Sequence, residues 1–322
     1  MLAVMVGLSA CKRAESEAGT SGGAETTKKI QIAIDLWPGY FPLLLADDLG
    51  YLGKRGVEVE VSVPQDTHRM IADFAGGRYD AICVSMGDLV LAYPRAREIR
   101  MILCSDESAG ADQVIGPEAL KDPVQLFGKR IGTTVGGFGE LLVRRFVASR
   151  GLKPTDITLV NADAANGLRL LKEKQIDAAH TWEPYATEAR ASGYSLLFSS
   201  AEAPGLILDG LVVHSRSITE DRERMQALVL AWFEAVEWWK QNPEQAEHRL
   251  NRVFTRLALP ARPISTEGIL IHDAAANRKL FSRGAEGGLE KSALEFIRFF
   301  SERGSLPMAP DPKALIDGSL IP

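Results

Sequence analysis

The sequence predicts an α/β protein built from two similar lobes. From Ile30 onward, short apolar runs alternate with amphipathic stretches, which is the pattern of strands joined by helices. The same order of strands, turns and helices occurs twice, beginning once at Ile30 and again at Lys129, so one lobe is expected to be built twice. β-like segments at 113–115 and 209–213 offer two places where the chain crosses between the lobes, and two crossings predict a hinge.

The composition is that of an ordinary globular protein. The 322 residues are 46% hydrophobic and 25% charged, which leaves room for two domains. The formal net charge of −5 lacks the basic footprint of a nucleic-acid-binding protein, so no nucleic acid is expected as a partner. After residue 11, no apolar run approaches the ~20 residues that a membrane span needs.

The first 29 residues are predicted to be an export signal and a tether. Residues 1–11 are apolar and end in Leu-Ser-Ala-Cys, which resembles a bacterial lipobox, so Cys11 is the predicted lipidation site. Residues 12–29 are small and polar, which predicts a flexible linker. The expected location is the periplasm or cell surface, with a lipid anchor in a bacterial membrane. The usual basic start of a signal is missing, and a frayed apolar terminus with a chance Cys is the alternative.

The first passage is organised around the turn Trp37-Pro38-Gly39-Tyr40, between a strand and a helix. Its proline, with Pro42 just beyond, removes backbone donors and stiffens the corner. Asp66 or Thr67 is a suitable N-cap for the second helix. The predicted strands are 30–36, 57–61, 80–84 and 99–104, and the predicted helices are 42–49, 67–74 and 88–93.

The second passage repeats this order, with Gly136-Gly137-Phe138-Gly139 in the place of the first turn. In each passage an Asp-Ala pair opens a strand, and these acids, Asp80 and Asp177, are predicted to be structural. The predicted strands are 129–135, 157–160 and 177–180, and the predicted helices are 140–152 and 164–173.

The C-terminal third is predicted to be helical and to cover the first lobe. Helices are expected to begin near 217 and 243, and to continue at 266–280 and 290–303. The expected domains are a first lobe formed by 30–108 with 210–322, and a second lobe formed by 109–209.

Four turns are expected to face one another across a cleft. They are 37–40, 85–88, 136–139 and 181–184. Helices between strands imply parallel pairing with right-handed crossovers. Each turn therefore lies at the carboxyl end of a strand, where open α/β sheets bind ligands.

The candidate ligand-binding residues come from these turns and from the crossing segments. Aromatic walls with a few aimed polar groups are typical of small-ligand pockets. The expected set is Trp37, Tyr40, Ser85, Asp88, Asp112, Gln113, Gly137, Phe138, Glu140, Trp182, Glu183 and Asp209, with Asp35 as a further carboxylate. Because these turns are rich in acids and contain no Arg or Lys, they favour a ligand with an amine or another cationic part.

Simpler roles are open for several of these residues. The rings of Trp37 and Tyr40 would equally cap a hydrophobic core, and Asp88 would equally cap the helix that follows it. The two remaining cysteines, Cys83 and Cys104, are expected to be buried small side chains, although an exported protein also permits a disulfide between them.

Patterns typical of catalysis are missing. The five His residues are scattered without metal-ligand spacing, and neither a nucleophile elbow nor a P-loop is present. The turn at 136–139 lacks the spacing of a dinucleotide fingerprint, but its backbone N–H groups suit a carboxylate, sulfonate or nitrate oxygen. The sequence therefore predicts no catalytic residue, no metal and no cofactor.

Several segments together resemble one protein family. They are WPGYFP at 37–42, LGYLGKRGV at 49–57, SAGAD at 108–112, LFGKRIG at 126–132, WEP at 182–184, and the two Asp-Ala pairs. At these residues the chain resembles the solute-binding proteins of ABC importers in the nitrate/sulfonate/taurine group, the NMT1/THI5-like superfamily. The resemblance covers nearly all of residues 30–240.

This resemblance implies the type II periplasmic-binding-protein fold, with two Rossmann-like lobes joined by a two-segment hinge and a ligand trapped on closure. It also implies an ABC permease and an ATPase as partners of a monomeric receptor. Family members that bind inorganic anions or sulfonates often offer Ser or Thr where this chain has Gly-Gly-Phe-Gly. Nitrate and bicarbonate are therefore less expected than an amino-sulfonate, a sulfonate or another small nitrogenous solute.

Two other functions are compatible with the same fold. One is a pyrimidine-precursor binding protein or enzyme of the thiamine type, although the Cys-rich motif and active-site His that such synthases need are not found. The other is a sensory or scaffold lipoprotein that binds a partner through the cleft. Permease and ATPase genes beside this one would favour the importer.

Overall fold

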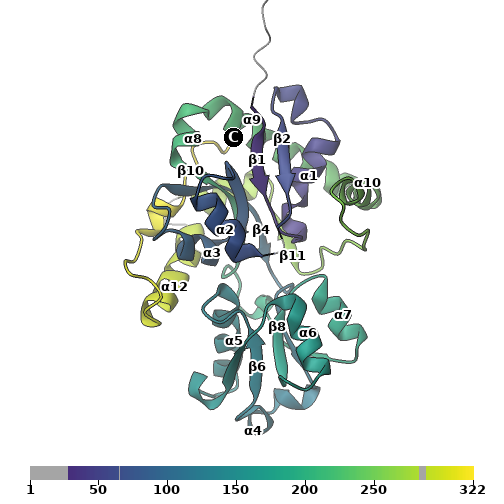
Figure 1. Ribbon diagram of the computed structural model, residues 1–322, viewed down its shortest axis with the longest axis vertical. Coiled ribbons are helices and arrows are strands. Elements are labelled where there is room, and N and C mark those ends of the chain that lie inside the picture. The colour runs from purple at the N-terminus through teal and green to yellow at the C-terminus, as the bar shows by residue number, and fades with distance from the viewer. Residues whose placement is uncertain (1–27, 65, 283–287) are drawn as a thin grey trace, which may run out of the picture.

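The computed structural model describes residues 28–64, 66–282 and 288–322, and these form two lobes, each with its own β-sheet (Figure 1). Cys11, its signal and most of the linker lie outside the described residues. The prediction of an α/β protein with two similar lobes is confirmed by the topology of the two sheets.

The sheet of lobe 1 has six strands in the order β11-β4-β10-β3-β1-β2. Strands β1, β2 and β3 are parallel, whereas β10 and β11 run antiparallel to their partners. The bounds are β1 Ile30–Ala33, β2 Val59–Ser62, β3 Ala81–Ser85, β4 Ile99–Ser108, β10 Leu208–His214 and β11 Ile269–Ile271.

The sheet of lobe 2 has five strands in the order β7-β6-β8-β5-β9. Again three strands are parallel, and an antiparallel strand, β5, joins them to the last. The bounds are β5 Gln113–Gly116, β6 Arg130–Thr133, β7 Thr158–Asn161, β8 Ala178–Thr181 and β9 Ser195–Ser199. Read in reverse, the order β9-β5-β8-β6-β7 corresponds to β4-β10-β3-β1-β2 of lobe 1, which has β11 in addition.

Equivalent hydrogen bonds confirm the internal repeat. Asp80 accepts a bond from the backbone N–H of Gln31 at 2.9 Å, and Asp177 accepts one from the N–H of Arg130 at 2.8 Å. Asp80 thus joins the start of β3 to β1, and Asp177 joins the start of β8 to β6 in the same way. Both acids have the structural role expected of them.

Helices cover both faces of each sheet. In lobe 1 they are α1 Phe41–Asp48, α2 Thr67–Ala75, α3 Met86–Ala92, α8 Ser215–Glu220, α9 Arg222–Gln241, α10 Pro243–Arg256, α11 Ala274–Phe281 and α12 Leu289–Glu302. In lobe 2 they are α4 Pro123–Leu126, α5 Phe138–Ser149, α6 Ala164–Lys172 and α7 Tyr185–Ala191. The helix expected at 266–280 is wrong in its first half, because residues 269–271 instead pair with β4 as the edge strand β11.

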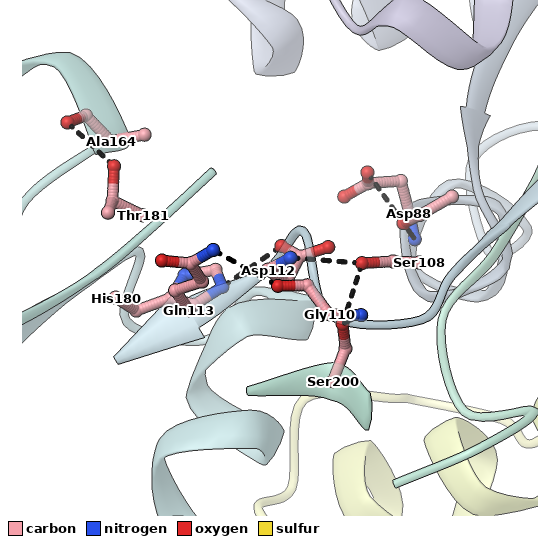
Figure 2. Close-up of polar contacts among 10 residues, drawn as sticks. Asp88, Ser108, Gly110, Asp112, Gln113, Ala164, His180, Thr181 and Ser200 are labelled. Carbon is pink, nitrogen blue, oxygen red and sulfur yellow. Dashed lines mark hydrogen bonds and ion pairs between the residues drawn. The ribbon is translucent and has the colours of Figure 1, made fainter. Parts of the chain in front are cut away.

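The chain crosses between the lobes twice, from β4 to β5 and from β9 to β10, as a two-segment hinge requires. Two fully buried hydroxyls join the crossings: Ser108 Oγ lies 2.8 Å from Ser200 Oγ (Figure 2). Ser200 Oγ also accepts from the N–H of Gly110, and Ser108 Oγ accepts from that of Asp112. The two hinge segments are therefore cross-linked by hydrogen bonds.

Cys83 and Cys104 are both buried and free, so they are not joined by a disulfide. Among the described helices, none is both long and apolar enough to cross a membrane.

Candidate functional site

Each of the four predicted turns connects a strand to the helix that follows it. The turn 37–40 is a 3-10 turn after β1, and 85–88 starts α3 after β3. In lobe 2, 136–139 leads into α5 and 181–184 leads into α7. Since β1, β3, β6 and β8 all belong to the parallel parts of the sheets, each turn lies at a carboxyl end, as expected.

The two lobes touch at Gly87 and Phe138. A Cβ added to Gly87 in α3 would lie only 2.6 Å from Cβ of Phe138 in α5. Any larger residue at 87 would therefore push the lobes apart, so this position needs glycine for the contact. The lobes are in contact in this conformation.

Three rings of lobe 2 form an aromatic cluster. Phe138 lies 5.9 Å from His180 and 6.0 Å from Trp182 between ring centroids, and His180 lies 5.6 Å from Trp182. Trp182 also packs against the core cluster of lobe 1. Sequence reasoning predicted Phe138 and Trp182 but left His180 out, because a single His in a strand carries no spacing signal.

Trp37 and Tyr40 are held by two buried acids behind them. Trp37 Nε1 donates a 2.9 Å bond to Asp106 Oδ1, and Tyr40 Oη donates a 2.6 Å bond to Asp209 Oδ1. Both rings are also part of the core of lobe 1, with 5% and 2% of their surface exposed. The core-capping role left open for these rings is therefore present, together with a polar anchor for each.

Asp106 and Asp209 stand directly opposite each other on β4 and β10. Burial, with Asp112 and Asp35 nearby, raises the pKa of Asp106 to about 7. Burial and the neighbouring Asp106 raise the pKa of Asp209 well above its usual range. Because two adjacent carboxylates in a poorly solvated place do not both ionise readily, this pair retains a proton near neutral pH.

Two more acids of lobe 1 share this environment. Asp35 is partly exposed and accepts from the N–H of Trp37, while desolvation of its carboxyl group raises its pKa to about 7. Desolvation also raises the pKa of Asp88. Asp88 and Ser85 bond reciprocally: Ser85 Oγ donates to Asp88 Oδ2 and accepts from its N–H, so Ser85 is the N-cap of α3.

Asp112 extends the acidic group to lobe 2. Its carboxylate lies 3.1 Å from His180 Nε2, and its backbone bonds to both hinge serines (Figure 2). Within the part of the chain that the structure describes, no Lys or Arg pairs with Asp35, Asp88, Asp106, Asp112 or Asp209. The negative charge of these acids, when ionised, is therefore not balanced by any described Lys or Arg side chain.

The other predicted polar residues have cationic partners that the sequence did not reveal. Arg190 of α7 donates to Gln113 Oε1 at 2.7 Å and to Glu183 Oε1 at 3.1 Å. Glu140 is fully buried and pairs with Arg144 and Arg303, while accepting from the N–H of Gly136. The turns themselves contain no Arg or Lys, but the neighbouring α5, α7 and the end of α12 supply Arg144, Arg190 and Arg303.

Thr133 is a further polar group that sequence reasoning missed. It is the last residue of β6 and is fully buried, and its Oγ1 has no hydrogen-bond partner among the described residues. Oγ1 lies 3.1 Å from the position of a Cβ added to Gly139, next to the start of α5. Gly137, the N-cap of α5, makes no side-chain cap. The hydroxyl judged missing from the Gly-Gly-Phe-Gly turn is thus available just before it.

Two surface hollows of about 300 and 560 Å³ lie on lobe 1, near His214 and near Tyr79. None of the predicted site residues lines either hollow. No group of three or more His, Cys, Asp and Glu within the described ranges is arranged to hold a metal ion.

The geometry defines a two-lobed α/β protein with a polar, aromatic interface between the lobes, which is the architecture of periplasmic binding proteins. The chain matches the family model described as NMT1/THI5 like over residues 37–246, more than half of its length. It therefore belongs to that family, as its motifs suggested.

Individual relatives agree with this assignment. BAB2_1146 of Brucella abortus (strain 2308), which is named as a binding protein, is 24% identical over 217 residues, 66% of this chain and 66% of the relative. The match thus spans about two thirds of that relative. A 4-amino-5-hydroxymethyl-2-methylpyrimidine phosphate synthase of Uromyces fabae is 27% identical over 158 residues, 48% of this chain and 46% of the synthase.

Among solved structures, the periplasmic aliphatic sulphonate binding protein SsuA from Escherichia coli superposes with a TM-score of 0.68. It is 17% identical, and the match covers 90% of this chain and 92% of SsuA. This likeness confirms the predicted periplasmic-binding-protein fold.

Proposed function

We propose that this protein is an extracytoplasmic solute receptor, which captures a small solute between its lobes and delivers it to an ABC importer. The proposal includes a permease and an ATPase as partners, action as a monomer, and attachment to a bacterial membrane through Cys11. The family and the fold support the class, and the contact between turn 85–88 of lobe 1 and turn 136–139 of lobe 2 supports the place of binding.

One observation carries the chemical class of the solute: buried acids without a protein cation. Asp106, Asp112 and Asp209 are each at most 6% exposed, and among the residues that the structure describes only His180 offers any of them a basic partner. A buried charge is costly unless it is paired. A solute with a protonated nitrogen would supply that pairing, and the rings of Trp37 and Trp182 suit it.

A second set of protein groups, all hydrogen-bond donors, suits a hydrogen-bond acceptor on the same solute. At the start of α5 the N–H of Glu140 bonds to Gly137 O, whereas those of Phe138 and Gly139 have no backbone acceptor among the described residues, and the partnerless Thr133 hydroxyl lies beside them. The oxygens of a sulfonate or carboxylate would accept hydrogen bonds from these N–H groups and from the Thr133 hydroxyl. We therefore favour a dipolar solute such as an amino-sulfonate, with its nitrogen toward lobe 1 and its oxygens toward α5.

The alternative is binding or processing of a pyrimidine precursor, as the name of the Uromyces relative suggests. The two described cysteines, Cys83 and Cys104, are poorly suited to such chemistry, because burial raises the pKa of both thiols well above their usual range. We therefore propose a receptor that is not an enzyme.

The test is a melting-temperature screen of the purified protein against taurine, alkanesulfonates, nitrate, bicarbonate, polyamines, betaines and pyrimidines. A ligand that binds only the folded state raises the melting temperature. We expect a nitrogen-bearing solute to do so, and Trp182→Ala to reduce the shift. A screen in which no solute raises the melting temperature would contradict the receptor function.

A further inference from the structure

Glu140 lies in the first turn of α5, directly after the turn 136–139, and its side chain points into the protein. Its Oε2 accepts from the N–H of Gly136 at 2.9 Å, and its Oε1 accepts from Arg144 Nε at 2.7 Å and from Arg303. Both its oxygens accept hydrogen bonds from protein donors, and its side chain is fully buried. A buried carboxylate with such partners fixes the groups around it.

Arg303 belongs to the other lobe. It caps the C-terminus of α12, which packs against α3 of lobe 1 and also against α5 of lobe 2. Figure 1 shows α12 on the same side of the molecule as α5. The Glu140–Arg303 pair therefore joins the two lobes, although 163 residues separate its members.

A second ion pair and a shared ring reinforce this contact. Arg145 Nη2 of α5 lies 2.9 Å from Glu295 Oε2 of α12. The guanidinium groups of Arg144 and Arg303 lie 5.6 and 5.9 Å from the ring of Phe299. α12 of lobe 1 is thus connected to α5 of lobe 2 by two ion pairs, and the arginines around one of them also contact the ring of Phe299.

We propose that Glu140 is a positioning residue which, with the parallel Arg145–Glu295 pair, fixes the turn 136–138 to α12 and holds the two lobes in contact. The role of this contact in binding rests on the proposed function, because we place the acceptor group of the solute at the turn 136–138. Its geometry is testable without any solute, so a failed ligand screen leaves the test intact.

The test uses the ligand-free full chain. Arg303→Gln should raise the radius of gyration in small-angle X-ray scattering and speed hydrogen exchange at residues 136–138 by about tenfold or more, as the loss of a charge-assisted bond implies. Arg298→Gln is the matched control, because Arg298 is an exposed arginine of the same helix with no ion pair in the structure. It should change neither quantity.

A charge swap separates the ion pair from general damage to folding. Arg145→Glu and Glu295→Arg should each raise the radius of gyration, and the double variant should restore it. Should Arg303→Gln fail to fold, the swap series tests by itself whether the contact between α5 and α12 holds the lobes together. An unchanged radius of gyration in Arg303→Gln and in both single swaps would overturn the proposal. Faster exchange at 136–138 without lobe separation would also overturn it, since Glu140 would then act only on its own turn.

Discussion

Tyr40 donates a 2.6 Å hydrogen bond from its hydroxyl to Asp209, which lies 169 residues away on the antiparallel strand β10. The turn after the first strand is thereby attached to the segment by which the chain returns to lobe 1. Trp37 is attached in the same way to Asp106 on the neighbouring strand β4. The two rings of the turn are thus set in place by the two acids of one opposed pair.

Tyr40→Phe should lower the free energy of unfolding by about 1–3 kcal/mol at pH 8, because it leaves the buried Asp209 without its donor. The loss should be smaller at pH 5, because burial raises the pKa of Asp209 and the protonated carboxyl, which is favoured as the pH falls, depends less on the Tyr40 donor. Urea denaturation at both pH values checks this. Tyr79→Phe is the control, since Tyr79 is similarly buried in lobe 1 and lies outside the site. Equal losses at the two pH values would argue against the role of Asp209.

The contribution of Asp106 to the stability of the ligand-free protein should fall as pH rises. Asp106 has a pKa of about 7 in the folded state against about 3.9 when unfolded, so between these values the folded chain binds more protons. The stabilisation is fully present below about pH 4 and is lost as the pH rises through about 7, with a size on the order of a few kcal/mol.

Asp106→Asn isolates this contribution, because an amide does not titrate. The free energy of unfolding should depend less on pH in this variant than in the unmodified protein between pH 4.5 and 8. Parallel pH dependences for the two proteins would mean that Asp106 is ionised in the folded state throughout.

The hinge serines should act as a pair. Ser108→Ala and Ser200→Ala each remove one end of a 2.8 Å contact between the two crossings, and each should cost about 1 kcal/mol of stability. Their double variant should cost less than the sum by about 0.5 kcal/mol or more, since the bond is lost only once. Strict additivity in a denaturation cycle would show that the hydroxyls are not coupled.

Trp182→Ala and Trp37→Ala should each weaken solute binding about tenfold, measured by fluorescence titration or calorimetry. Trp37→Ala should also lower stability, because Asp106 loses its indole donor. Trp238→Ala, on α9 away from the turns, is the control for aromatic loss. Normal binding by both site variants would refute the placement of the solute between the lobes.

Much of this fold could be predicted from local patterns. Strands such as β3 and β8 follow from an apolar run after Asp-Ala, and their repetition in the chain revealed two similar lobes. The four turns followed from the rule that parallel strands end at one edge of a sheet. These inferences succeed because each depends on neighbours in the sequence.

The partners of the site residues could not be predicted in this way. The pairing of Glu140 with Arg303 was not foreseen because Arg303 follows α12 near the end of the chain, and the pairing of Gln113 with Arg190 was not foreseen because 77 residues separate them. Asp106 was overlooked because its pairing with Asp209 depends on strand register, which alternation of residue types does not fix. Thr133 gave no signal because a hydroxyl without a partner is visible only in three dimensions.

The most direct measurement compares two solutes that differ only in the protonated nitrogen, with taurine and ethanesulfonate as the pair for an amino-sulfonate. Isothermal titration calorimetry at pH 8 should show the amine-bearing member binding at least about tenfold more tightly, and Asp209→Asn should reduce this preference. Equal or tighter binding of the member that lacks nitrogen would contradict the account that buried acids between the lobes select a cationic group.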